Sequence, residues 1–194
     1  LSNERAVIKL NGADHIIFDS LNITALGSDA FSHYGFGFHL LNNADSNTIK
    51  RCKILINPNV SSGDRYAGIV INGGTSPAFS NNSLSDGNLI ERNTIIGGIY
   101  GITLLGTDAL PARNNTITGN TIQNFYQYGI YLASSATTTI TGNDFSRPNR
   151  TTSPTGGVYG ISVSSSNLVA NISKNRIHAM FDSEPTTTNT FYGI

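Results

Sequence analysis

The feature that most constrains this chain is a short motif that recurs along its whole length of 194 residues. An aromatic residue, a glycine and two alternating apolar residues recur as YGFGF from Tyr34, YGITL from Tyr100, YGIYL from Tyr128, YGISV from Tyr159, YGI from Tyr192 and the variant YAGIVI from Tyr66. The motif glycines are expected at Gly35, Gly68, Gly101, Gly129, Gly160 and Gly193, with spacings of 33, 33, 28, 31 and 33. Periods of about 20 to 50 residues are typical of solenoids, propellers and arrays.

A second pattern lies between the copies of the first: two apolar residues five positions apart. The pairs are Phe18/Ile23, Ile49/Ile54, Ile90/Ile95, Ile117/Ile122, Ile140/Phe145 and Ile172/Ile177. An odd separation sends two side chains to opposite faces of a flat strand, and a separation of five does not fit a helical stripe. Both side chains can point inward only if the chain turns a corner between them. With the glycine motif this gives three short strands per period, which predicts an all-β parallel solenoid of about six coils.

Other repeat folds fit these patterns less well. No period contains an apolar stripe long enough for a helical repeat, and no fixed leucine framework is present. A propeller blade needs four strands and about forty residues, which exceeds the observed spacing.

The corner of the apolar pair predicts an internal ladder. Its column holds Leu21, Cys52, Asn93, Asn120, Asn143 and Asn175. We expect the four asparagines to bond to one another at the strand spacing of about 4.8 Å. We also expect Asn120 to adopt the left-handed backbone region at the turn, because Asn tolerates that region better than most residues.

The segments NNTITGNTI, from Asn114, and YGIYL, from Tyr128, resemble the repeats of right-handed parallel β-helix proteins of the pectate-lyase-like superfamily and of bacterial surface proteins. The resemblance implies a single-stranded right-handed parallel β-helix. It does not select an activity, because that superfamily includes lyases, hydrolases, epimerases and scaffolds. In enzymes resembling this fold, the active groove lies on the outward face of the sheet that carries the Tyr-Gly motif.

Two outward rows are expected on that sheet. One holds Gly37, Val70, Thr103, Tyr131 and Ser162, and the next holds His39, Asn72, Leu105, Ala133 and Ser164. Neither row contains a carboxylate, whereas glycoside hydrolysis generally uses two carboxyl groups about 5 to 9.5 Å apart and calcium needs about six oxygen ligands. The ligand-binding candidates are His39, Thr103, Tyr131 and Ser162, and no cofactor is expected.

Loops provide the remaining candidates. Four connections into the Tyr-Gly strands are long (24–33, 55–65, 146–157 and 178–189) and two are short (96–98 and 123–126), which predicts a shallow cleft over Thr103 and Tyr131. Asp64 and Arg65 are the catalytic candidates there. His33 and His39 form a pair without a third ligand, so no metal site is predicted.

Composition excludes some partners. The formal net charge is zero and only 12% of residues are charged, so nothing indicates nucleic acid or an anionic membrane as a partner. No apolar run approaches the roughly 20 residues of a membrane span.

Three functions remain open. The first is a non-catalytic structural or adhesin-like segment of a secreted or cell-surface bacterial protein that contacts polysaccharide. The second is a polysaccharide lyase or glycoside hydrolase with catalytic groups on loops. The third is an accessory assembly protein for a periplasmic metal site, which would bind metal through His33 and His39.

The final motif, YGI, stops inside a strand. Residues 1–194 are therefore expected to be one β-helix segment excised from a longer chain, with the remainder of that chain or a capping neighbour covering the open end.

Overall fold

The computed structural model is built from parallel strands that wind around one axis, and it describes residues 5–27, 35–75, 77–80, 83–164, 169–184 and 187–194. Sheet A contains, in spatial order, β1 (Ala6–Asn11), β4 (Phe36–Leu41), β7 (Ala67–Ile71), β10 (Tyr100–Leu105), β14 (Tyr128–Ala133), β18 (Val158–Ser164) and β21 (Phe191–Tyr192). Sheet B contains β2 (Ile17–Asp19), β5 (Thr48–Lys50), β8 (Leu89–Glu91), β12 (Thr116–Thr118), β16 (Thr138–Thr141) and β19 (Ala170–Ser173). Sheet C contains β3 (Asn22–Ala25), β6 (Lys53–Ile56), β9 (Thr94–Ile96), β13 (Thr121–Gln123), β17 (Asp144–Ser146) and β20 (Arg176–His178). A small extra pair, β11 (Ala112–Arg113) and β15 (Ser135–Ala136), lies beside them.

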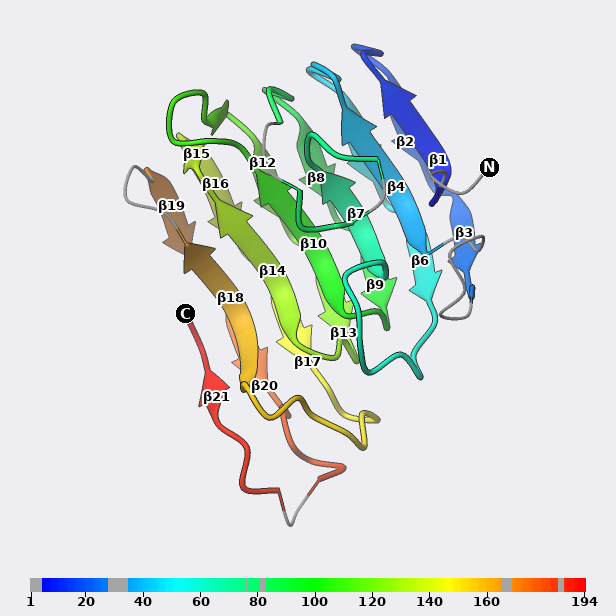
Figure 1. The fold of residues 1–194 in the computed structure, drawn as a ribbon, viewed down its shortest axis with the longest axis vertical. Coiled ribbons are helices and arrows are strands. Elements are labelled where there is room, and N and C mark those ends of the chain that lie inside the picture. The colour runs from blue at the N-terminus through cyan, green and yellow to red at the C-terminus, as the bar shows by residue number, and fades with distance from the viewer. Residues whose placement is uncertain (1–4, 28–34, 76, 81–82, 165–168, 185–186) are drawn as a thin grey trace.

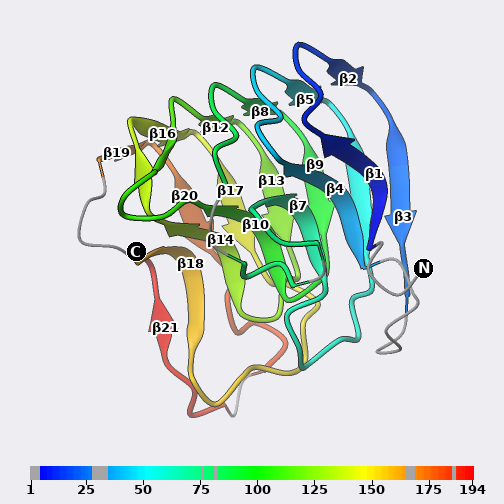
Figure 2. The same cartoon turned by 45° about the horizontal axis from the view of Figure 1, so that its top comes forward.

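The chain passes through sheets A, B and C in turn, and each pass lies on the one before it (Figures 1 and 2). Six such passes confirm the predicted parallel solenoid of about six coils. None of the described residues belongs to an apolar helix of bilayer-spanning length.

The core runs along the axis between the three sheets. Ile117 on β12 and Ile122 on β13 both have no exposed surface, and each pairs with its equivalents in the coils before and after. A corner between the two strands turns both side chains inward, as the five-residue spacing predicts. Stacked in this way, the coils bury an apolar column that no single coil could bury.

The corner between sheets B and C differs in detail from the sequence prediction. Gly119 occupies the left-handed region with φ of 63°, and its equivalents Arg92 and Gly142 have φ of 52° and 65°. The prediction that Asn120 itself adopts this conformation is wrong, because the turn is made one residue earlier. Asn120 is thereby left with its side chain inside the corner, where it is buried.

The asparagines of this corner are joined along the axis. Amide Nδ2 atoms of Asn93, Asn120 and Asn143 donate to Oδ1 of the next asparagine at 3.0, 2.9 and 3.0 Å, ending at Asn175. Each of these Oδ1 atoms also accepts the backbone N–H of the residue one coil earlier at 2.9 Å, a series that begins at the N–H of Cys52. The buried amides therefore have partners on both sides, which stabilises them inside an apolar core.

A second ladder lies at the corner between sheets A and B, and the sequence analysis missed it. The backbone N–H of Asn47 donates to Oδ1 of Asn88, and Asn88 donates from its backbone and its side chain to Oδ1 of Asn115. Each member lies five residues before a member of the first column, so the repeated spacing of two polar residues five apart was the available signal.

The motif glycines avoid a collision with the core. A Cβ on Gly101 would lie 2.4 Å from a methyl group of Ile122 and 2.4 Å from the carbonyl oxygen of Gly129. In the second coil this position belongs to Gly37, whose added Cβ would meet the Gly68 carbonyl oxygen at 2.6 Å. The prediction of Gly35 for this place is wrong, because YGFGF contains two glycines and fits the repeat in two registers.

This shift of two residues changes which residues of β4 face outward. Phe38 pairs with Ile69, and His39 pairs with Val70. The predicted inward pair of Phe36 and Phe38 is therefore replaced by Phe38 and Leu40, and His39 takes the outward place that had been predicted for Gly37.

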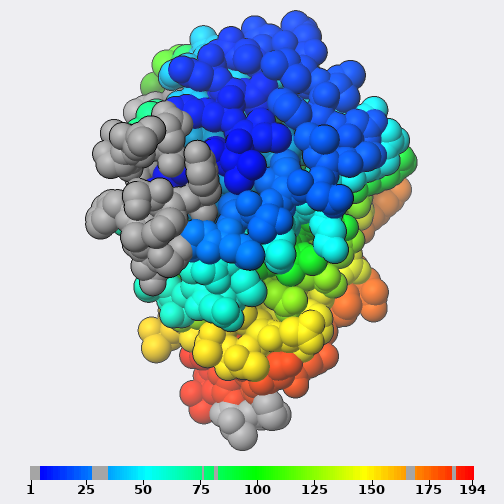
Figure 3. Space-filling model, turned by 90° about the vertical axis from the view of Figure 1, so that its right-hand side faces the viewer, coloured from blue at the N-terminus to red at the C-terminus, as the bar shows by residue number. Residues whose placement is uncertain are grey.

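The two ends of the solenoid expose apolar residues of columns that are buried in the middle. Leu21 in the first coil and Val163 in the last long strand are both 37% exposed. Cys52, the next member of the Leu21 column, is 1% exposed, and Leu104 and Leu132, the equivalents of Val163, have no exposed surface. Much of the first coil is visible in Figure 3, which looks onto that part of the molecule.

Candidate ligand-binding face on sheet A

The outward face of sheet A divides into two halves with different surroundings. Its central row runs along the axis as Lys9, His39, Val70, Thr103, Tyr131 and Ser162. His39, Val70 and Thr103 are buried, whereas Ser162 is half-buried and its neighbour Ser164 is exposed.

The cause is the connection between β7 and β8, which we call the cover loop (residues 73–86). It leaves the end of β7 and runs back to the start of that strand, where the N–H of Ala78 donates to the carbonyl oxygen of Asp64 at 2.6 Å. It then returns to the end of β10, where the N–H of Ser83 donates to the carbonyl oxygen of Leu105 at 3.0 Å. In Figure 1 this segment crosses in front of sheet A after β7. The predicted open cleft over Thr103 and Tyr131 is therefore wrong, because this loop fills the place.

The covered half, which spans β4, β7 and β10, is held to the loop by a buried polar pair. His39 Nε2 and Asn72 Oδ1 lie 2.7 Å apart, and Asn72 Nδ2 donates to the carbonyl oxygen of Pro77 at 2.8 Å. His39 also packs edge-on against Phe36 with ring centroids 5.6 Å apart. Its expected role as a surface ligand contact is wrong, since only 1% of the residue is exposed.

Thr103 lies beside this pair and is fully buried. Among the described residues its hydroxyl has no hydrogen-bond partner. The expectation that Thr103 faces a ligand is therefore also wrong, because no part of it reaches the surface.

The metal-site hypothesis has little support on this face. His33 lies outside the described residues, and the described part of the chain contains no group of three or more His, Cys, Asp or Glu side chains that could hold an ion. His39 is engaged with Asn72.

The open half, which spans β14, β18 and β21, begins where the cover loop ends. One tyrosine from each of the strands β10, β14, β18 and β21 forms a stacked series that we call the tyrosine row, and it begins at the edge of the covered half: Tyr100, Tyr128, Tyr159 and Tyr192. Successive ring centroids are 5.4, 4.9 and 4.6 Å apart, with interplanar angles of 3°, 18° and 10°. Exposure increases along the row, from buried Tyr100 to Tyr192 at 44%. The sequence showed these tyrosines as part of the repeat, but not that their rings stack outside the sheet.

Phe79, at the tip of the cover loop, joins the two halves. Its ring lies 4.5 Å from the ring of Tyr131 and 6.1 Å from that of Tyr100. Tyr131 also meets Tyr128 edge-on at 5.2 Å. Tyr131 is therefore only 9% exposed, and its predicted exposed ring is replaced at the surface by Phe79, which is 42% exposed.

Burial changes the acidity of the first tyrosines of the row. Removal from water raises the pKa of the Tyr100 phenol above its ordinary value, and the neighbouring Tyr128 adds to the effect. Burial also raises the pKa of Tyr128, with Tyr159 as the second cause. These hydroxyls therefore stay protonated near neutral pH and can both donate and accept hydrogen bonds.

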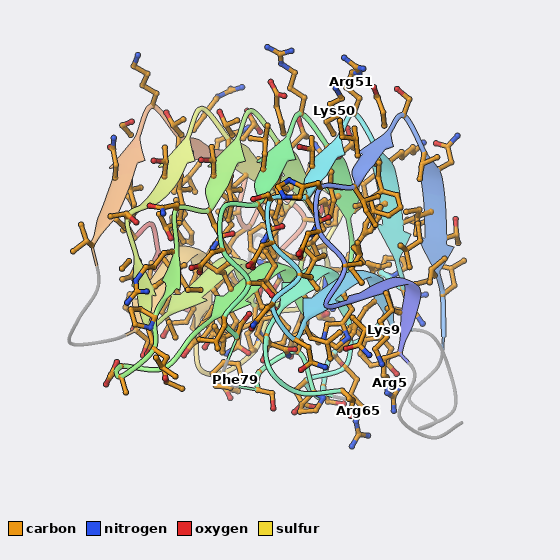
Figure 4. All side chains as sticks on the ribbon, turned by 90° about the horizontal axis from the view of Figure 1, so that it is seen from above. Arg5, Lys9, Lys50, Arg51, Arg65 and Phe79 are labelled. Atoms are coloured by element: carbon orange, nitrogen blue, oxygen red, sulfur yellow. The ribbon has the colours of Figure 1, made fainter. Side chains whose placement is uncertain are left out.

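Asp64 and Arg65 lie at the start of β7, beside the covered half. Their side chains form an ion pair with Arg65 Nε 3.8 Å from Asp64 Oδ1. Burial lowers the pKa of the Arg5 guanidinium, and the charge of nearby Arg65 adds to the effect. Figure 4 shows Arg5, Lys9, Arg65 and Phe79 along one side of the solenoid, away from Lys50 and Arg51. The structure does not bring Asp64 and Arg65 together with Ser162 in the open half, which lies three coils further along sheet A.

The coiled parallel sheets, the internal ladders and the loop-flanked outer face define a parallel β-helix. The model of the right handed beta helix region matches residues 2–183, and the chain belongs to this family.

No curated protein matches this chain. Among solved structures, the chain is similar to the crystal structure of the periplasmic alginate epimerase AlgG, with a TM-score of 0.51 and 14% sequence identity. The similarity covers 91% of this chain and 43% of that one, so this chain spans less than half of the epimerase. At this identity the likeness describes the fold.

Proposed function

We propose that this β-helix is a non-catalytic segment that binds polysaccharide through the open half of sheet A. The observation that carries the proposal is the tyrosine row. In stacked rings the faces contact one another, so Tyr128, Tyr159 and Tyr192 offer their edges and hydroxyl groups to a ligand, one from each of three successive strands. A glycan chain offers hydroxyl groups at regular intervals, which these phenols can bond.

Two neighbouring features support a sugar as the ligand. Ser162 and Ser164 add hydroxyl groups beside the row, and the exposed ring of Phe79 supplies an apolar face against which the C–H side of a sugar ring can pack. Ser162 was a sequence candidate for ligand contact, and it lies on this open half.

We place the parent protein outside the cytoplasm of a bacterium, secreted or at the cell surface, in an adhesin-like or structural role. The periplasmic location of the epimerase with a similar fold supports the compartment, and the hydroxyl-rich exterior supports the role.

Binding to a panel of neutral and acidic polysaccharides, measured by affinity electrophoresis, tests the proposal. Wild-type protein should be retarded by at least one glycan, and Tyr159→Ala with Ser162→Ala should abolish the retardation. Thr116→Ala, on the outer face of sheet B, is the matched control and should bind like wild type. Retardation that persists in the double variant would remove the open half as the binding site.

A lyase or glycoside hydrolase is the second candidate, and the specific observation in its favour is the Asp64–Arg65 ion pair beside the same sheet. The same glycan panel, assayed for shorter or unsaturated products, separates the two functions. Turnover that Asp64→Asn or Arg65→Ala abolishes would establish the enzyme and contradict the non-catalytic role.

We also propose that further coils of its own chain, or a capping neighbour, cover the exposed ends. Leu21 and Val163 are partly exposed members of columns whose central members are buried. Light scattering, which gives the oligomeric state, and amide hydrogen exchange test this together. In an isolated monomeric segment, strands β2 and β19 should exchange their amide protons quickly. Slow exchange at both ends in a monomer would contradict it.

A further inference from the structure

The structure contains a second polar recess, on the corner between sheets C and A. Two long connections flank it, residues 57–66 between β6 and β7 and residues 147–157 between β17 and β18. The two coils between them turn this corner with short connections, 97–99 and 124–127. The long connections therefore stand up as walls, and the short ones form a floor.

Arg150 ties the two walls together over the floor. Its Nη1 donates to the carbonyl oxygen of Pro58 and its Nη2 donates to that of Val60. The guanidinium lies over the ring of Tyr126, with Cζ 4.8 Å from the ring centroid. Because these contacts join residues about ninety positions apart in the sequence, they fix the distance between the walls.

The base of the second wall is equally well held. Arg147 is fully buried, and its guanidinium donates to the carbonyl oxygens of Phe125, Thr152 and Met180 at 2.8, 2.8 and 2.9 Å. Burial lowers the pKa of Arg147 to about 10, against the opposing effect of Glu184 at 3.4 Å. The guanidinium remains charged at neutral pH, so the wall is preformed rather than assembled by a ligand.

Two hollows lie along this corner. The first has a volume of about 360 Å³ and is lined by Pro58, Asn59, Asn124, Asn149, Arg150, Thr151 and Thr152. The second has a volume of about 330 Å³ and is lined by Ser61, Ser62, Gly63, Ile99, Tyr126, Gln127, Ser153, Pro154 and Thr155. Along each wall and along the floor, the residues of the second hollow follow those of the first. The two hollows are therefore neighbours between the same two walls, and we call the pair the corner trough.

The lining of the corner trough indicates the ligand. Its side chains are mainly amides and hydroxyls, and none of the residues that line it is acidic. Its one cation, Arg150, is 4% exposed and already donates to two carbonyl groups, so it is not available as an ion-pair partner for an acidic sugar. Amides and hydroxyls bond a ligand that both donates and accepts, which describes the hydroxyl groups of an uncharged sugar.

Each hollow lies at the lower end of the range of about 300 to 1,000 Å³ found for small-ligand sites. We propose that the corner trough is a binding site for a short neutral oligosaccharide, distinct from the tyrosine row. The inference shares only its ligand class with the proposed function, because it uses other residues, on the corner that precedes the strands of sheet A.

Amide chemical shifts of isotope-labelled protein, titrated with cellohexaose, mannohexaose and tetragalacturonate, test the inference. At least one neutral hexaose should shift the amides of Asn59, Tyr126 and Thr151. The double substitution Gln127→Ala with Thr151→Ala should weaken this response tenfold or more, while the fold is kept because neither side chain is buried. Thr116→Ala should leave the response unchanged.

The inference is overturned if no neutral hexaose shifts the trough amides at its solubility limit, if the double variant binds like wild type, or if tetragalacturonate binds the trough more tightly than the neutral sugars. The two sites fail separately. Ser162→Ala, which lies on the open half and away from both walls, should weaken the shifts on the open half and leave those of the trough, so loss of one set of shifts with retention of the other identifies which site is wrong.

Discussion

The covered and open halves of sheet A have the same backbone and the same repeat, yet they present different chemistry. Val70 and Thr103 in the first half occupy the same outward row as Ser162 in the second. The first two are fully buried and Ser162 is not. The difference comes from one insertion, the cover loop, placed between two coils. In a solenoid the strands decide which positions face outward, and the connections decide which of those positions meet solvent.

The largest difference between the halves is expected at the second outward row, which holds Asn72 in the covered half and Ser164 in the open half. Asn72→Ala removes the bonds to His39 and to the Pro77 carbonyl, and it should lower the free energy of unfolding by about 2 to 4 kcal/mol, because each buried polar group that loses its partner costs about 1 to 3 kcal/mol. Ser164→Ala should change it by less than about 0.5 kcal/mol. Urea denaturation measures both free energies of unfolding. Equal effects of the two substitutions would show that Asn72 does not hold the cover loop in place.

Phe79→Ala should expose the residues of sheet A where the covered and open halves meet. Loss of a ring that is 42% exposed should lower the free energy of unfolding by about 1 to 2 kcal/mol and expose Tyr131. The chain contains no tryptophan, so quenching of tyrosine fluorescence by acrylamide reports the exposure directly. Leu110→Ala, at another exposed apolar loop residue, should leave the quenching unchanged. Unchanged quenching in Phe79→Ala would contradict the packing of Phe79 on Tyr131.

Thr103→Val in the covered half should stabilise the protein, unlike a change at the equivalent position of the open half. The Thr103 hydroxyl is buried without a partner among the described residues, so its replacement by a methyl group should raise the free energy of unfolding by about 1 kcal/mol. Ser162→Val on the open half buries nothing and should not stabilise the protein. If Thr103→Val destabilises the protein, the hydroxyl has a partner beneath the cover and this part of the account is wrong.

The smallest effect is expected at the tyrosine row and only at alkaline pH. Burial raises the pKa of Tyr100 above the unfolded value of about 10. The stability linked to this group is complete below the unfolded pKa and is lost as the pH rises through the folded pKa. Tyr100→Phe should therefore match wild type at neutral pH and lose less stability above about pH 10. Identical pH profiles would show that Tyr100 is not desolvated.

Much of the fold was predictable because apolar side chains at fixed spacing leave few alternatives. Ile117 and Ile122 indicate a corner, and their equivalents indicate a stack of coils. The register of β4 was not predictable from the motif alone, since Gly35 and Gly37 both fit it. The pairing of β4 with β7, in which Phe36 lies opposite Ala67 and Phe38 opposite Ile69, places Gly37 rather than Gly35 beside Gly68.

The site was less predictable because it depends on a segment outside the repeat. Nothing in the strand pattern shows that residues 73–86 fold back over sheet A, and Phe79 has no equivalent in the other coils. The same segment explains why His39 and Thr103 are buried while Ser162 faces the open half. Arg150 was visible in the sequence as a polar loop residue, but its contact with Pro58 joins coils that no local pattern connects.

Hydrogen exchange with and without a bound glycan tests whether only the open half of sheet A binds a ligand, because it reports on both halves in one experiment. The glycan used is the one that retards the protein in affinity electrophoresis. Added protection is expected in peptides from β14 and β18 and no change in peptides from β4 and β7, which the cover loop already shields. Protection that appears on β4 and β7 instead, or equally on all four strands, would contradict the division of this face into a covered half and a ligand-binding open half.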